Sequence, residues 1–286
     1  MSLRKVGAHY GSRLYVDPLI FRNEVKKFIY QIKHILGSDS QSLQQKHNAF
    51  TTYCLTVANY SSGHRPVLDP MAFREDIDLK SGLMMINDKV STSATERRVV
   101  SLSSGAIDVL VAYLSHLLGL AYELDQIDGM SAIANTVHRI VTPVHFAAQP
   151  IPLFFYLGPN NEIIRISNSR LRRSYGISWR YETNHNRHHI ETSLYEKKLE
   201  SIFIDCHLGH QNQLSHPLGL NSGLTHAEYS WNVKPLLDEL HAESGWEILE
   251  GFVDKGFVPK NNKILQRKCR YGYYDRRSRR FKISKY

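Results

Sequence analysis

Apolar residues recur at helical spacing from the first part of the chain onwards. In residues 18–36 they return every three or four positions, which is the period of one buried helix face. Asp17 and Pro18 stand at the start of this segment and Gly37 stands at its end, as at many helix termini. The other segments predicted as helices are 41–59, 169–175, 184–196, 199–208 and 228–241.

A further helix is predicted where Ser103 or Ser104 can cap a long apolar segment. Short β-rich runs precede and follow that helix. Residues 83–86 and 98–102 read as two strands joined by a polar segment, and residues 153–157 and 163–166 read as a second hairpin. The side chains expected on the buried face of the capped helix are Ile107, Leu110, Val111, Leu114 and Leu118.

These elements predict an α+β fold, mostly helical, with small antiparallel hairpins. The pattern is least regular between residues 119 and 182, which reads as an expanded region. No internal repeat is visible. We expect one main domain over residues 1–241 and a C-terminal extension over residues 242–286.

Composition narrows the class of protein. No apolar run reaches the ~18–20 residues needed to span a bilayer, and no apolar segment follows the basic N-terminus as in a secretory signal. The three cysteines are far apart and odd in number, which fits a reducing cytoplasm. We therefore expect a cytoplasmic protein without a membrane partner.

Positive charge is concentrated at the C-terminus. The segment from Lys263 to Tyr286 holds ten basic residues and one acid, so it accounts for the whole net charge of +9. Tyrosines interleave with these basic residues, a composition that suits phosphate contact and base stacking. The residues expected to contact DNA are Arg267, Lys268, Arg270, Arg276, Arg277, Arg279 and Arg280.

Arginine, histidine and tyrosine residues follow one another in an order that suits phosphodiester chemistry. Arginine binds phosphate oxygens with a planar fork, a lysine can protonate a leaving oxygen, and a tyrosine can form a covalent intermediate. The segments that carry these residues are Ser61-Ser62-Gly63-His64-Arg65-Pro66, Lys89, Arg97 to Leu102, Arg187 to Leu194, Leu208-Gly209-His210 and Tyr229.

Taken together, these segments resemble the tyrosine recombinase (phage integrase) family over roughly residues 40–241. The resemblance implies a mobile-element enzyme that breaks and rejoins double-stranded DNA without a cofactor, as a tetramer on DNA in the nucleoid. It assigns Arg65 and Arg187 to the scissile phosphate, Lys89 as general acid, His210 as a phosphate donor and Tyr229 as nucleophile.

The sequence also departs from the family's pattern. Asn184 stands where histidine or lysine is usual, three residues before Arg187. Either that base is dispensable, or His185 replaces it, or activity is reduced; His188 is a further accessory candidate. The segment between His210 and Tyr229 is long and rich in Asn, Gly and Ser, and we expect a flexible tether that docks Tyr229 late. Only 64 residues precede Arg65, too few for the family's separate core-binding domain.

Two other functions stay open on the sequence. One is an integrase-like protein that binds DNA without turnover, which the asparagine at position 184 favours. The other is a metal-dependent hydrolase that uses the histidines. His185, His188 and His189 are close in sequence, and His207 with His210 forms an i, i+3 pair.

Overall fold

The computed structural model describes residues 17–64, 74–86, 98–141, 152–175, 185–210, 218, 223–252, 272–275 and 280–283. Helices dominate these segments and the strands are short. The helices are α1 (Pro18–Gly37), α2 (Leu43–Ser62), the 3-10 turn η1 (Arg74–Asp76), α3 (Ser104–Asp125), α4 (Ser131–Val141), α5 (Asn168–Ser174), α6 (His185–Glu196), α7 (Ser201–Leu208) and α8 (His226–Ser244). The strands are β1 (Ile77–Asp78), β2 (Leu83–Ile86), β3 (Arg98–Ser101), β4 (Phe155–Leu157), β5 (Ile163–Arg165), β6 (Gly272–Asp275) and β7 (Arg280–Ile283).

The helix ends follow the signals in the sequence. Asp17 caps α1, accepting a hydrogen bond from the Leu19 amide at 2.8 Å, and Pro18 occupies the first turn, where its missing N–H costs nothing. Ser42 and Gln45 form a reciprocal capping box at the start of α2. These local hydrogen bonds define where each of the two helices begins.

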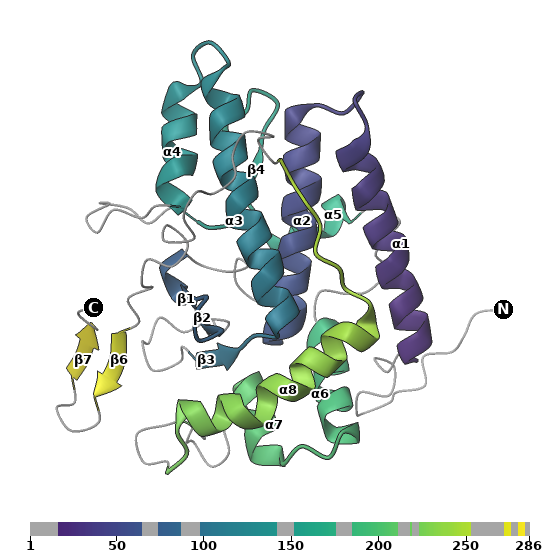
Figure 1. The fold of residues 1–286 in the computed structure, drawn as a ribbon, viewed down its shortest axis with the longest axis vertical. Helices are drawn as coiled ribbons and strands as arrows, with labels where there is room; N and C mark the ends of the chain where they lie inside the picture. The colour runs from purple at the N-terminus through teal and green to yellow at the C-terminus, as the bar shows by residue number, and fades with distance from the viewer. Residues whose placement is uncertain are drawn as a thin grey trace.

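The helices form two groups (Figure 1). Helices α1, α2, α3 and α4 stand side by side, and α8 crosses near the ends of α1, α2 and α3 together with α6 and α7. The apolar faces of both groups meet in one core cluster, in which Phe21, Phe50, Tyr53 and Tyr229 are fully buried. Burial of these large side chains supplies the main driving force for docking the two groups.

The strands form small antiparallel sheets. β2 lies between β1 and β3, with Met84 opposite Ile77 on one side and Val100 on the other. β4 pairs with β5, and β6 pairs with β7 through Tyr273 opposite Lys282. The predicted fold class, mostly helical with small antiparallel hairpins, is therefore confirmed.

Two predictions about the middle of the chain were wrong. On the predicted buried face of α3, Leu110 and Leu114 lie in the core as expected, but Ile107, Val111 and Leu118 are only partly buried, and Tyr113 and Leu117 lie in the core as well. The start of the irregular region also continues α3 to Asp125 and then forms α4, which packs against α3. The first error arises because α3 contacts α2, α4 and α8, so its apolar positions exceed one stripe.

α3 has the length and apolar composition of a membrane-spanning helix. It runs through the interior beside α2 and α4, and its residues from Ala106 to Leu124 contribute heavily to the core (Figure 1). A buried core helix meets the same length and composition criterion.

Candidate functional site

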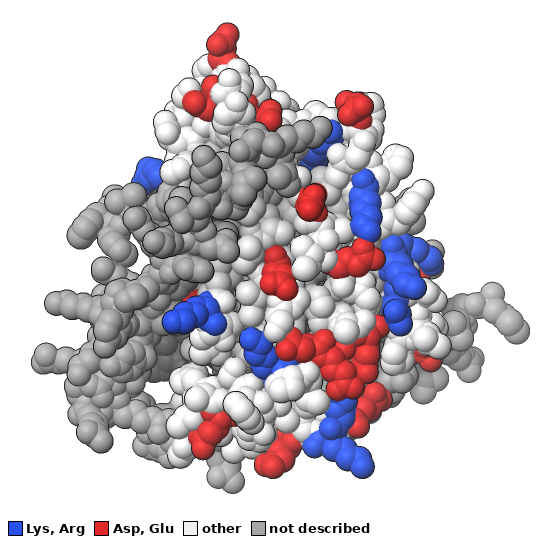
Figure 2. All heavy atoms as spheres, viewed as in Figure 1, with Lys and Arg blue, Asp and Glu red and all other residues white. Residues whose placement is uncertain are grey.

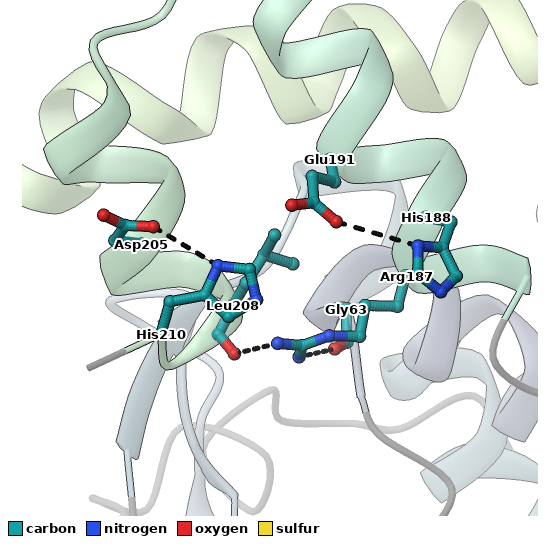
Figure 3. A network of polar contacts seen from close by, with 7 residues as sticks. All are labelled: Gly63, Arg187, His188, Glu191, Asp205, Leu208 and His210. Atoms are coloured by element: carbon teal, nitrogen blue, oxygen red, sulfur yellow. Dashed lines mark hydrogen bonds and ion pairs between the residues drawn. The ribbon is translucent and has the colours of Figure 1, made fainter. Parts of the chain in front are cut away.

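Arg187 is buried at the start of α6 and binds two main-chain carbonyls (Figure 3). Its Nη1 donates to the Gly63 carbonyl at 3.0 Å, and its Nη2 donates to the carbonyl of Leu208. Gly63 ends α2 and Leu208 ends α7. One guanidinium therefore ties the first turn of α6 to the C-terminal ends of two other helices.

Arg98, on β3, also binds main-chain carbonyls at the ends of α2 and α7. Its Nη2 donates to the Gly63 carbonyl at 3.2 Å, and its Nη1 donates to the carbonyl of His207. Arg98 and Arg187 thus share one acceptor oxygen. A carbonyl oxygen carries only a partial charge, so these bonds orient the two guanidiniums without neutralising them.

Two glycines make this convergence possible. Gly63 has φ 56° and Gly209 has φ 66°, in the left-handed region that ends α2 and α7. A Cβ on Gly209 would lie 2.5 Å from Cδ of Arg98, so a side chain there would collide with the arginine. The Gly209 position in the Leu208-Gly209-His210 segment is therefore explained by backbone conformation and by the passage of Arg98.

Tyr229 lies in the first turn of α8, fully buried next to this arginine pair. Its hydroxyl lies 2.7 Å from Nδ1 of His207 and accepts a hydrogen bond from the Ser101 amide at 3.1 Å. Burial raises the pKa of the tyrosine above its usual value, although the Ser101 amide and Arg98 act in the opposite direction. Tyr229 is therefore a neutral phenol in this arrangement.

His207 is neutral as well. Burial first, and then the charges of Arg98 and Arg187, lower its pKa to about 3. The ring thus offers an uncharged acceptor to the tyrosine, while the main-chain carbonyl of the same residue binds Arg98. The single residue His207 therefore links Tyr229 to Arg98.

The expected tether between His210 and Tyr229 lies largely outside the described residues, so the late docking of Tyr229 stays a prediction. In the described arrangement the hydroxyl is held by His207 and Ser101, and α8 places the ring in the core. A capping box between Thr225 and Glu228 fixes the helix turn just before it. The nucleophile candidate therefore sits on a defined helix start.

His210 and His188 lie beside Arg187 and are both partly exposed (Figure 3). Nδ1 of His210 is 3.3 Å from a carboxylate oxygen of Asp205, and Nδ1 of His188 is 3.8 Å from one of Glu191. Partial burial lowers the pKa of His188, against the effect of Glu191 and with smaller contributions from Arg187 and His210. The electrostatic influence of His210 on His188 fits their placement on either side of Arg187 in Figure 3.

His185 occupies a different environment. Its ring is buried, with its centroid 5.8 Å from that of Phe21 and 6.2 Å from that of His189. Burial, together with the charges that His189 and His188 would carry, lowers its pKa to about 4. In this arrangement His185 is part of the aromatic packing between α6 and α1.

The structure thus brings together Arg187, His210 and Tyr229 from the predicted set. Several predicted residues lie outside the described segments, so their placement stays a prediction. These are Arg65, Lys89 and Asn184, and in the tail Arg267, Lys268, Arg270, Arg276, Arg277 and Arg279; Arg280 belongs to β7, of which the backbone alone is described.

Arg98 and His207 were missed as site residues. Arg98 was assigned only to a strand, and His207 entered only the metal hypothesis through its spacing from His210. An arginine at the start of an apolar strand was the available signal, because a buried charge needs specific partners. For His207 no pattern in the sequence indicated that its ring would meet Tyr229.

A metal centre would need several ligands in one place. Among the residues that the structure describes, no group of three or more His, Cys, Asp and Glu side chains is placed to hold a metal ion.

Comparison with known proteins gives a match among solved structures only. No protein-family model matches the chain, and no curated protein matches it. Among solved structures, that of XerA recombinase is similar in fold, with a TM-score of 0.34 and 15% sequence identity. The match covers 79% of this chain and 64% of the recombinase, so the chain spans less than two thirds of that protein's length.

Proposed function

We propose that this chain breaks and rejoins strands of double-stranded DNA through a 3′-phosphotyrosyl intermediate formed on Tyr229. The observation that carries the proposal is the network in which Arg187 and Arg98 share the Gly63 carbonyl, while His207 joins Arg98 to the Tyr229 hydroxyl. Fixed guanidiniums beside a tyrosine hydroxyl are the groups that phosphoryl transfer to tyrosine requires.

The chemistry follows from the roles of these groups. The Tyr229 oxygen attacks phosphorus and releases its proton to water, while the bond between phosphorus and the 5′-oxygen breaks. Lys89 gives the leaving oxygen a proton, and Arg65, Arg187 and His210 bind the non-bridging oxygens, where negative charge grows. The phosphotyrosyl ester retains the energy of the broken bond, so a second 5′-hydroxyl can reverse the step without ATP.

In the described arrangement the candidate site is closed. The carbonyls of Gly63 and Leu208 occupy the Arg187 fork that a phosphate would bind, and Tyr229 is fully buried. Binding of a phosphate therefore has to displace these carbonyls, and Tyr229 has to leave His207 before it attacks. We further propose that this happens in a tetramer on DNA, in a cytoplasmic, nucleoid-associated protein.

A second candidate is DNA binding without turnover. The burial of Tyr229 and the two hydrogen bonds to its hydroxyl favour this reading, as does asparagine at position 184. It differs from the main proposal in one observable, because it predicts a salt-dependent complex and no covalent product.

A suicide duplex, nicked so that the cleaved fragment diffuses away, tests the main proposal. Wild type should give a covalent adduct that survives denaturing electrophoresis, and Tyr229→Phe should give none. Tyr195→Phe is the matched control, because Tyr195 is 52% exposed, on the solvent side of α6. Equal adduct from wild type and Tyr229→Phe would show that another residue is the nucleophile, and no adduct from wild type with a normal gel shift would support the second candidate.

A further inference from the structure

Outside the tail, basic and acidic residues balance, yet one surface segment is strongly basic. Residues 163–175, which span β5 and α5, contain four arginines and no acidic residue. We call the four side chains the α5 patch: Arg165, Arg170, Arg172 and Arg173, all of which are exposed.

The α5 patch is anchored to the core by side-chain packing. Leu171 and Tyr175 are both buried, and these two positions face the core while the arginines face solvent. Thr56 on α2 donates to the Tyr175 hydroxyl at 3.0 Å. A short α5 of seven residues is thus fixed by packing, since an isolated helix of this length would not be stable.

A second set of hydrogen bonds fixes the end of α5. The Ser174 hydroxyl lies 2.7 Å from the Tyr156 hydroxyl on β4, and Thr52 on α2 donates to Ser174 at 3.2 Å. At the other end, Ser167 caps α5 and Arg170 donates to the Arg165 carbonyl at 2.7 Å. The arginines therefore project from a surface that cannot easily rearrange.

Charge elsewhere on the molecule favours this surface over the one that α8 presents. Figure 2 shows mixed charge on the viewed face, with acidic side chains gathered over the second half of α8. That half of α8 contains Asp238, Glu239 and Glu243. A polyanion on the α8 face would meet these carboxylates, of which Glu239 and Glu243 are paired with Lys197, whereas residues 163–175 contain no acidic residue.

We infer that the α5 patch binds the phosphate backbone of duplex DNA next to the site around Arg187; this inference rests on the proposed function. Helix α2 links the two surfaces. Thr52 and Thr56 in its middle contact α5, and Gly63 at its end contacts Arg187. At 1.5 Å per residue these points are about 10–16 Å apart along the helix.

Binding of a fluorescent 40-base-pair duplex of mixed sequence tests the inference, with affinity measured across a range of salt concentrations. Arg170→Gln with Arg173→Gln should weaken binding about tenfold or more near 0.1 M salt and lower the slope of log K against log salt by about 1.8, because two phosphate contacts are lost. Arg170→Lys with Arg173→Lys should keep most of the slope.

The matched control removes two exposed cations elsewhere, Arg139 on α4 and Lys198 after α6, each changed to Gln. This control should bind within about twofold of wild type. Equal affinity and salt slope for the two Gln pairs would overturn the inference. So would selective loss of binding to phosphatidylserine vesicles by the α5 pair with DNA binding unchanged.

The suicide-duplex assay separates this inference from the proposed function. If the α5 pair loses DNA affinity while wild type forms no adduct, the patch stands and the enzymatic proposal falls. If wild type forms the adduct and the α5 pair binds DNA as wild type does, the enzymatic proposal stands and the patch falls.

Discussion

The hydroxyl of Tyr229 lies 2.7 Å from Nδ1 of His207, and both side chains are fully buried. The direction of this hydrogen bond depends on the tautomer of His207. We assign the proton of the neutral ring to Nε2; Nδ1 then accepts the phenolic hydrogen, while the tyrosine oxygen accepts from the Ser101 amide.

This pair predicts a measurable coupling. Tyr229→Phe should cost about 1–3 kcal/mol of unfolding free energy, because the Ser101 amide and the His207 ring each lose a buried partner. His207→Leu should cost a similar amount by leaving the hydroxyl without its acceptor. In urea unfolding the double variant should lose less than the sum of the two, by roughly 0.5–3 kcal/mol. Strict additivity would mean that the bond contributes nothing.

A glycine comparison tests the close passage of Arg98. Gly209 and Gly129 both have positive φ, at 66° and 80°, but a Cβ on Gly129 would meet nothing within 4 Å. Gly129→Ala should therefore cost only the left-handed conformation, about 1–2 kcal/mol. Gly209→Ala should cost a further ~1–3 kcal/mol, because Arg98 must move. Equal unfolding free energies for the two variants would contradict the crowding that we describe.

The folded chain should lose stability in mild acid, because it contains a buried pair of hydrogen-bonded histidines that resist protonation. The Phe252 amide donates to Nδ1 of His116, whose Nε2 donates to Nδ1 of His47 at 2.9 Å; His47 Nε2 donates to the Phe155 carbonyl at 3.1 Å. In each ring one nitrogen donates a hydrogen bond and the other accepts one, so neither ring can take a second proton without breaking one of these hydrogen bonds. Burial lowers the pKa of His47 to about 3 and that of His116 well below its usual value.

The sign of the effect follows from these depressed values. Unfolded histidine gains its proton below about pH 6.5, while folded His47 stays neutral down to about pH 3. Unfolding is therefore favoured as pH falls from 6.5 towards 3, by at most about 1.4 kcal/mol per pH unit for each such histidine. Melting temperature should fall steadily over this window. His47→Gln with His116→Gln should show a shallower fall, and an unchanged slope would assign the effect to other groups.

Much of the fold could be predicted because local signals set it. Asp17 and the apolar period located α1, the apolar period alone located α2, and β-rich runs located β2 and β3 within one residue. α4 was missed although its buried residues Ala134, Val137, Ile140 and Val141 recur at helical spacing, so the signal was present in the sequence. For α3, which contacts α2, α4 and α8, contacts between elements decide which positions are buried.

The hydrogen bonds of the candidate site could not be predicted from the sequence. Arg187, His210 and Tyr229 were chosen because their order along the chain suits phosphodiester chemistry. Arg98 becomes a site residue through the Gly63 carbonyl, which lies where α2, α6 and β3 converge, and His207 through its contacts with Tyr229 and Arg98. That convergence depends on tertiary packing, which the sequence does not display as a pattern.

The start of α8 offers a way to loosen the hold on Tyr229 without touching it. The Thr225 hydroxyl accepts a hydrogen bond from the Glu228 amide at 3.1 Å, and Glu228 accepts one from the Thr225 amide at 2.8 Å. Thr225→Ala removes the cap and should cost about 1 kcal/mol, while Thr225→Ser should retain most of it. Because Tyr229 lies in the capped turn, amide hydrogen exchange at residues 227–230 should speed up in the alanine variant while exchange in α2 stays unchanged. If Tyr229 must leave His207 before it attacks, the alanine variant should also form the covalent adduct faster than the serine variant. Faster exchange with a slower adduct would show instead that the capped turn is needed to place the attacking oxygen.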